Sequence, residues 1–499
     1  MRRASGQLLN NDSMQCLSEY QRAEATQLMW DICQDRSNLF EHIRRYMTSF
    51  MLGVLYGSRG PSLSSPDVAD FMDVHPKFMA ILEIDTAPPV DIFPVLKLEQ
   101  LFDRLLSKVE NRLESGQQNG ALLEEAILHE REWGLISRDH LLHLGGTLLE
   151  GSDTCSAALQ NAVYTLTIFP EIQRKLHAEL NDVVGRDRVP EWDNLLNLPY
   201  LKAFIEECNR YRPVGPLGLP HAMSKDEVID SYLYPKDAVI FTNIYGMFHD
   251  ERYFDHPEEF IPERFLERPF GIKKGVDDDP ARRLNMLFGA GRRVCPGIVL
   301  AKATLEINIA NFAWGFEFLP LVDAISGKGV YPSLDTYAPG ITATPQAFPV
   351  RIIPRSEEHI RTIQAQFESL QIALSRMYNS QPNLLDHQQL RNVQFTTTNI
   401  LIEAFAAGNL FTLNDETLQR RAENHLGWVS NSLDSAQARV VIAQTRCLVL
   451  VTSCPLSLAA ADIHPLPVKT HIDKAAASTT IRFAVLGVAL EPIRQYLQT

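Results

Sequence analysis

One cysteine of this chain lies in a stretch whose residue types suit thiolate chemistry. Cys295 is part of the run FGAGRRVCPG at residues 288–297, and an apolar helical pattern begins directly after it at Ile298. Glycine permits backbone conformations that side chains forbid, and the proline stiffens the exit from the cysteine. We therefore expect Cys295 at a helix N-terminus, where the helix dipole and free N–H groups stabilise negative charge on sulfur. Arg292 and Arg293 are expected to add positive charge beside it.

A glycine-rich turn around a buried free cysteine is the alternative, and a lone Cys-Pro-Gly would favour it. The whole stretch, however, resembles the haem-binding loop of the cytochrome P450 family. The matching positions are Phe288, Gly291, Arg293, Cys295 and Gly297. The resemblance implies that Cys295 is the thiolate ligand of the iron in haem b (heme b, iron protoporphyrin IX). It also implies that Phe288 packs beside the sulfur and that Arg293 binds a haem propionate.

A second stretch, Glu150-Gly-Ser-Asp-Thr-Cys155, lies within a long helical pattern at residues 137–169. Glycines cost about 1 kcal/mol each in a helix, so they indicate a kink or a close approach, and helix packing alone would explain them. The stretch resembles the oxygen-activation motif of the same family. The resemblance implies that Gly151 opens a groove for dioxygen, and that Asp153 and Thr154 deliver protons to it. Glu150 and Cys155 depart from the family pattern, which has a small residue and a hydroxyl there.

Three charged residues and one histidine have further implied roles. Glu207 and Arg210 share a helix face, and such pairs are usually exposed and contribute little. Together with Arg264 they resemble the family's Glu-x-x-Arg and Pro-Glu-Arg-Phe motifs, which implies a structural network behind the haem. His221 occupies the place where the family has a propionate-binding Arg or His, although a histidine in a loop is most often just exposed.

Composition excludes several classes of partner. The chain has 499 residues, a formal net charge of -14 and a pI near 5.5, which argues against nucleic acid or an anionic membrane. No apolar run approaches the ~20 residues of a membrane-spanning helix. The seven cysteines are scattered, which suits a reducing compartment. We expect a cytoplasmic protein, or one peripheral to the endoplasmic reticulum.

Periodicity predicts a mainly α chain with a minor β part. Helical patterns cover parts of residues 15–60, where the last one ends at Tyr56-Gly57, and they recur at residues 137–169, 170–185 and 198–213. Strand-like segments occur at residues 232–234, 238–241 and 348–353. The family resemblance runs from about residue 20 to about 356. It implies a P450 fold without its N-terminal part, forming a partial catalytic domain at residues 1–356. Residues 357–499 are expected to form a helical extension of unknown function, beginning with an amphipathic helix at 360–377 that packs on the body or on other tail helices.

These features together predict a haem-thiolate monooxygenase. The resemblance implies electrons from NADPH through NADPH–cytochrome P450 reductase, with an apolar organic substrate. Lys and Arg outnumber Asp and Glu between residues 264 and 293, where the family docks its reductase. Residues 41–46 and 89–94 resemble filamentous-fungal members, which suggests secondary metabolism. Two alternatives stay open: a non-catalytic haem-binding remnant that acts as an interaction protein, and an enzyme that isomerises or dehydrates its substrate on the same haem.

Overall fold

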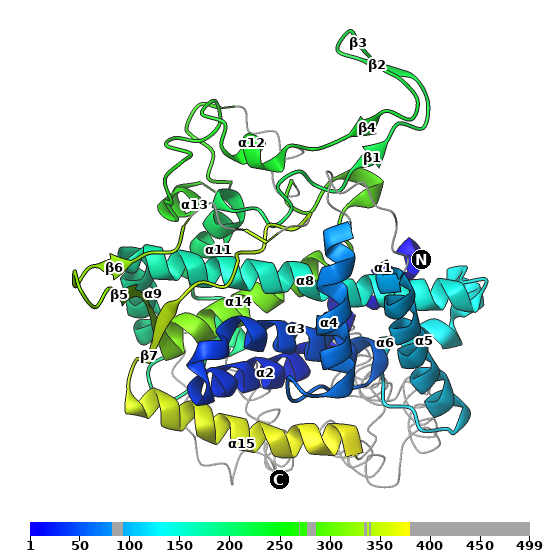
Figure 1. Cartoon of the computed structure of the whole chain (residues 1–499), viewed down its shortest axis with the longest axis horizontal. Coiled ribbons are helices and arrows are strands. Elements are labelled where there is room, and N and C mark those ends of the chain that lie inside the picture. Colours follow the sequence, from blue (N-terminus) through cyan, green and yellow to red (C-terminus); the bar gives the residue numbers. More distant parts are fainter. Residues whose placement is uncertain (82–92, 269, 277–285, 334–336, 339–340, 380–499) are drawn as a thin grey trace, which may run out of the picture. The chain divides into compact units, whose positions relative to one another are not determined.

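The structure, a computed structural model, describes residues 1–81, 93–268, 270–276, 286–333, 337–338 and 341–379. Within these ranges the chain is mainly helical and carries small antiparallel sheets, which confirms the predicted class (Figure 1). Residues 89–92 of the fungal-type stretch lie outside the described residues. So do the helices expected between residues 390 and 499.

The first part of the described chain is entirely helical. Its elements are α1 (Arg2–Leu8), α2 (Asn11–Gln34), the 3₁₀ turn η1 (Arg36–Asn38), α3 (Leu39–Tyr56), α4 (Pro66–Ile81), α5 (Phe93–Glu114), α6 (Leu122–Leu128), α7 (Glu130–Trp133), α8 (Arg138–Ile168), α9 (Pro170–Val183), α10 (Trp192–Leu195) and α11 (Pro199–Tyr211). The expected helices at 137–169, 170–185 and 198–213 are confirmed to within two residues at each end.

The second part alternates short strands with helices. Its elements are β1 (His221–Ala222), β2 (Glu227–Ile229), β3 (Tyr232–Tyr234), β4 (Val239–Ile240), α12 (Ile244–Phe248), α13 (Glu263–Glu267), η3 (Gly291–Arg293), α14 (Ile298–Gly315), β5 (Phe316–Val322), β6 (Gly329–Val330), β7 (Val350–Pro354) and α15 (Glu357–Asn379). The strands pair as β1–β4, as the hairpin β2–β3, and as β6–β5–β7, in each case antiparallel.

Local sequence explains where the principal helices begin and end. The Ser137 hydroxyl accepts a hydrogen bond from the His140 N–H and so caps α8. Pro170 cannot continue that helix and instead occupies the first turn of α9. Gly57 ends α3 in the left-handed region at φ +63°, where glycine carries no steric penalty.

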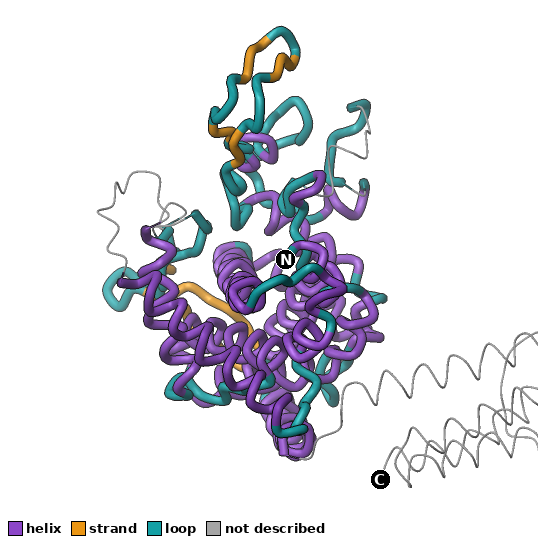
Figure 2. Tube along the Cα trace, turned by 90° about the vertical axis from the view of Figure 1, so that its right-hand side faces the viewer, coloured by secondary structure: helices purple, strands orange, loops and turns teal. Residues whose placement is uncertain are grey.

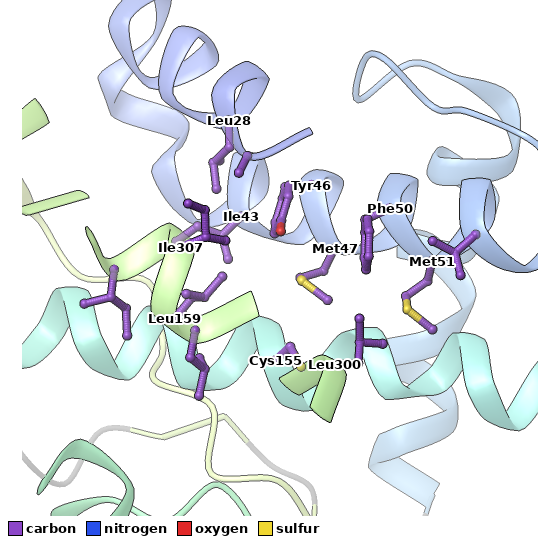
Figure 3. Close-up of a cluster of buried hydrophobic side chains, with 14 of the residues drawn as sticks. Leu28, Ile43, Tyr46, Met47, Phe50, Met51, Cys155, Leu159, Leu300 and Ile307 are labelled. Atoms are coloured by element: carbon purple, nitrogen blue, oxygen red, sulfur yellow. The ribbon is translucent and has the colours of Figure 1, made fainter. Parts of the chain in front are cut away.

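The core forms where successive helix layers meet. α8 packs on α3, α3 on α2, and α2 on α15, while α14 contacts both α2 and α8 (Figure 1). Figure 2 shows that helix dominates the described chain and that the strands are short. Apolar side chains of four of these helices point toward one another (Figure 3). They include Leu28 of α2, Phe50 of α3, Leu159 of α8 and Ile307 of α14. This packing holds α8 and α14, the two helices that carry or follow the sequence motifs, in fixed positions.

The amphipathic helix expected at residues 360–377 is confirmed as α15, and it packs on the body through α2. Ile363 is fully buried, and the rings of Trp30 and Phe367 stack with centroids 5.6 Å apart. Among the described residues, no helix combines the length and apolarity that crossing a bilayer requires.

Candidate functional site

The loop before α14 holds Cys295 in a tight turn. The Cys295 N–H donates to the Phe288 carbonyl oxygen at 2.8 Å, which closes the loop on itself. Gly289 and Gly291 adopt φ values of +74° and +62°, where a side chain would be strained. Cys295 is partly exposed and forms no disulfide. The glycines of this stretch therefore shape a turn that leaves the sulfur reachable.

The electrostatics of Cys295 differ in part from the sequence expectation. Burial raises the pKa of its thiol, and this effect outweighs the Gly297 backbone N–H and the Arg2 guanidinium, which both lower it. Arg292 and Arg293 were expected beside the sulfur, but both are exposed and neither is among the groups that lower this pKa. The arginine whose charge acts on the sulfur is instead Arg2, and its guanidinium donates to the Val294 carbonyl oxygen. The free thiol keeps its proton at neutral pH, and ligation of a metal cation would release that proton.

Helix α8 is buried along most of its length but has one open face. Its exposed residues between 143 and 154 are His143, Thr147, Gly151 and Thr154, spaced three or four apart and so aligned on one side. A Cβ atom added at Gly151 would meet no atom within 4 Å, whereas one added at Gly146 would overlap the Phe102 ring. The glycines of α8 thus have two different uses. Gly146 permits close helix packing, and Gly151 leaves open space.

Thr154 and the neighbouring Asp153 make few but definite contacts. The Thr154 hydroxyl donates to the Gly151 carbonyl oxygen at 3.1 Å. Asp153 Oδ2 accepts a hydrogen bond from the Thr342 hydroxyl at 3.0 Å, and Asp153 Oδ1 lies 3.9 Å from His75 Nδ1. Sequence reasoning missed His75 and Thr342, because neither belongs to a motif and only the fold brings them to α8.

The two residues that depart from the family pattern both have raised pKa values. Burial raises the pKa of Glu150 to about 7. Burial is also the main cause of the rise in the pKa of Cys155, to about 12. Helix α14, which begins three residues after Cys295, contacts α8. The fold therefore brings the helix that follows the cysteine loop and the helix that carries residues 151–155 together.

Glu207, Arg210 and Arg264 form one buried network. Glu207 Oε2 accepts from Arg210 Nε at 2.8 Å, and Glu207 Oε1 accepts from Arg210 Nη2 at 2.9 Å and from Arg264 Nε at 3.3 Å. The exposed fractions of the Glu207 and Arg210 side chains are 0% and 1%. Arg210 and Arg264 also donate to backbone carbonyls of residues 248–259. The network ties α11 to the segment that precedes the cysteine loop.

The structure leaves two of the predicted residues apart from this arrangement. His221 is exposed in β1, paired across the sheet with Ile240 of β4. Arg293 is exposed and makes no hydrogen bond or ion pair with any residue that the structure describes. Both are thus available to an anion.

Two cavities accompany these groups. One of about 210 Å³ is lined by Tyr164, Tyr337 and Phe348 beside α8. A smaller one of about 40 Å³ lies behind the cysteine loop, where Phe288 meets Phe254 and Arg210. Neither is lined by Cys295 or Thr154.

The residues present suit the haem that the sequence resemblance implies. Cys295 offers an unpaired, partly exposed sulfur, which is a suitable ligand for iron. The unfilled space at Gly151 lies on α8, which contacts the helix that begins three residues after that sulfur. The unpaired guanidinium of Arg293 suits a carboxylate such as a propionate. The chemistry of these residues therefore fits haem b, with Cys295 as the residue that would ligate its iron.

Comparison with known proteins gives the same assignment over most of the chain. Residues 8–325 match the family model described as cytochrome P450. A cytochrome P450 monooxygenase of Armillaria gallica is 35% identical over 364 residues, covering 70% of this chain and 69% of the relative. The cytochrome P450 monooxygenase atE of Aspergillus terreus is 31% identical and covers 72% of each chain. PatI of Penicillium expansum, also a cytochrome P450 monooxygenase, is 32% identical, covering 71% of this chain and 70% of that relative.

Solved structures agree on the fold. A zebrafish cytochrome P450 structure with abiraterone superposes with a TM-score of 0.59 at 23% identity, covering 71% of this chain and 81% of that one.

Proposed function

This chain belongs to the cytochrome P450 family, and from that membership we propose that it inserts one atom of dioxygen into an apolar organic substrate. The family's matched relatives are monooxygenases, and the family's cofactor is haem b with electrons supplied through a reductase. When bound, the haem supplies the dioxygen chemistry: with two electrons and two protons, one oxygen atom enters the substrate and the other leaves as water.

In this proposal the cysteine loop would hold the haem. Cys295 would provide the thiolate ligand, and Gly297 would stabilise it because its backbone N–H lowers the sulfur's pKa. Phe288 begins the loop, and its carbonyl oxygen accepts a hydrogen bond from the Cys295 N–H, which fixes the backbone there. Arg293 and His221 would bind the propionates. The buried network of Glu207, Arg210 and Arg264 would keep the loop in position.

Helix α8 contributes the oxygen side. Gly151 leaves room for dioxygen, because no atom beyond its chain neighbours and its own helix backbone lies within 4 Å of the place that a Cβ would occupy. The Thr154 hydroxyl, exposed on the same face, donates a hydrogen bond there, and Asp153 is the acid that resupplies its proton. The single observation that carries the proposal is this open face of an otherwise buried helix, which contacts the helix that follows the cysteine loop.

For the substrate and the electron donor we propose a chemical class rather than a particular molecule. An apolar organic molecule suits the family, and the matched relatives from Armillaria, Aspergillus and Penicillium are fungal. We place the reaction in fungal secondary metabolism on that basis. The exposed Arg292 and Arg293 suit an acidic electron-donor protein such as NADPH–cytochrome P450 reductase.

The experiment is a coupling measurement with Thr154→Ala. The haem-loaded chain is supplied with reductase and NADPH, and the product formed per NADPH consumed is compared with that of the wild type. Loss of the hydroxyl should lower this ratio several-fold, because reducing equivalents then leave as peroxide or water. Ser156→Ala is the matched control. Its hydroxyl makes a similar bond, to the Ser152 carbonyl oxygen at 2.8 Å, but is buried on another face of α8.

A second outcome would contradict the proposal. If product forms without NADPH and at the same rate in Thr154→Ala, the haem catalyses an isomerisation or dehydration, and oxygen insertion is excluded.

A further inference from the structure

Asp153 is held by two side chains that lie outside both sequence motifs. The Thr342 hydroxyl donates to Oδ2 at 3.0 Å, from the segment that precedes β7. His75 Nδ1 faces Oδ1 at 3.9 Å, from α4. One oxygen of the carboxylate is thus hydrogen-bonded, the other faces His75 beyond hydrogen-bond distance, and the Asp153 side chain is only 22% exposed.

His75 has no other polar partner among the described residues. Its side chain is 3% exposed, and its ring stacks on Phe71, one turn earlier in α4, with centroids 4.8 Å apart. The Nε2 atom is buried without a hydrogen-bond partner in the described part of the chain. If the ring of His75 served packing alone, an apolar ring would fill the same space without the free-energy cost of burying polar nitrogen atoms. The polar group that His75 does face is the Asp153 carboxylate.

The surrounding charges leave Asp153 as the favourable partner of His75. Burial lowers the pKa of His75, the Asp153 carboxylate raises it, and Arg44 of α3 lowers it. Arg44 itself pairs with Glu41. The remaining charges of α4 are engaged elsewhere: Asp73 pairs with Lys77, and Asp67 and Asp70 pair with Arg104 and Lys108 of α5. On α8, Asp153 is the group that faces the ring.

We propose that His75 is a positioning residue for Asp153: when neutral it leaves the acid free to serve Thr154, and when protonated it holds the acid away. The proposal rests on the proposed function, since it concerns the acid of that reaction. Neutral His75 leaves a 3.9 Å gap, which is longer than a hydrogen bond, so Asp153 can move toward Thr154. Protonated His75 closes the gap as an ion pair and holds Asp153 back. Coupling of NADPH consumption to product should therefore fall as the pH drops through the pKa of His75.

The direct test is histidine NMR on the full chain, loaded with haem and held in the diamagnetic ferrous carbon monoxide form. With ¹³C-labelled histidine, His75→Gln identifies the His75 signal, and the titration is repeated in Asp153→Asn. Removing the carboxylate should lower the pKa of His75 by about 1 unit or more, as expected for a charge at this distance. His177 of α9 is the control, because burial also lowers its pKa but its ring contacts the Phe316 carbonyl oxygen instead.

A second substitution perturbs the pair from the other side. Thr342→Val removes the hydrogen bond to Oδ2, so the carboxylate turns to His75 and the pKa of His75 should rise. Equal His75 titration curves in the wild type, Asp153→Asn and Thr342→Val would overturn the proposal.

The functional readout separates this proposal from the one it rests on. Product per NADPH should decline at low pH in the wild type, and this decline should be absent in His75→Gln. A decline of the same size and midpoint in both proteins would contradict the role of His75. Failure of the proposed function itself would be recognised separately, as the absence of any NADPH-dependent product at every pH, with the NMR shift unaffected.

Discussion

Replacing Glu207 by Gln tests whether the buried network is structural. Glu207 is fully buried, and its two oxygens accept hydrogen bonds from Arg210, from Arg264 and from the Ile261 N–H at 2.7 Å. Glutamine keeps the size of the side chain but removes its charge and turns one acceptor into a donor. Two arginines, 1% and 7% exposed, would then share a site without a carboxylate.

The expected cost follows from that burial. Removing one partner of a buried ion pair typically destabilises a protein by about 3–5 kcal/mol, because an uncompensated charge remains buried. We expect a loss of this size for Glu207→Gln. Burial already lowers the pKa of Arg264, which shows that its charged form is disfavoured without Glu207. A loss of about 4 kcal/mol is a large part of the total stability of a typical domain.

The assay is urea unfolding followed by circular dichroism, with Glu171→Gln as the matched control. Glu171 pairs with Arg174 at the same i, i+3 spacing, but the two side chains are 73% and 65% exposed. That pair should contribute at most about 1 kcal/mol, because solvent screens it. If Glu207→Gln is too unstable to purify, Glu207→Asp keeps the charge and should give an intermediate loss. Equal unfolding free energies for Glu207→Gln and Glu171→Gln would refute the reasoning.

Four further substitutions test other parts of the structure. Burial raises the pKa of Glu150 above its unfolded value to about 7, so the folded state holds a proton that the unfolded state releases. The stability of the wild type therefore falls as the pH rises from about 4.5 to 7. Glu150→Gln should thus raise the unfolding free energy at pH 8 by up to about 3 kcal/mol and have little effect near pH 4.5. Gly146→Ala should destabilise the chain by about 1–3 kcal/mol through overpacking, whereas Gly151→Ala should be neutral or stabilise it by up to about 1 kcal/mol, as measured by urea unfolding; the opposite order would contradict the two uses of glycine in α8. Phe367→Ala should lower the thermal midpoint, since it removes the stacking on Trp30, worth about 1 kcal/mol beyond the buried area; an unchanged midpoint would show that α15 is not held by this contact.

Local patterns predicted the helices that build the site. The apolar repeat between Ser137 and Phe169, with a capping serine and a terminating proline, gave α8 almost to the residue. The run of glycines before Cys295 predicted the loop, and two of them do adopt left-handed backbone angles. These features depend on neighbours in sequence, which periodicity and turn residues report directly.

Contacts between distant segments could not be predicted in the same way. The arginine whose charge acts on the Cys295 sulfur is Arg2, 293 residues earlier, whereas adjacency in sequence pointed to Arg292 and Arg293. His75 was missed because it belongs to no motif, and only the fold brings its ring to 3.9 Å from Asp153. The balance of burial and charge at the Cys295 sulfur likewise depends on the three-dimensional surroundings.

The most direct test of the central claim is the carbon monoxide difference spectrum of the reduced, haem-loaded chain. Cys295→Ser is compared with the wild type, and Cys33→Ser serves as the control because Cys33 is also partly exposed and free. The wild type and Cys33→Ser should show the long-wavelength Soret band for which the family is named, since that band requires a thiolate ligand, and Cys295→Ser should lose it. Absence of the band from the haem-loaded wild type, or its persistence in Cys295→Ser, would contradict the assignment of Cys295 as the iron ligand.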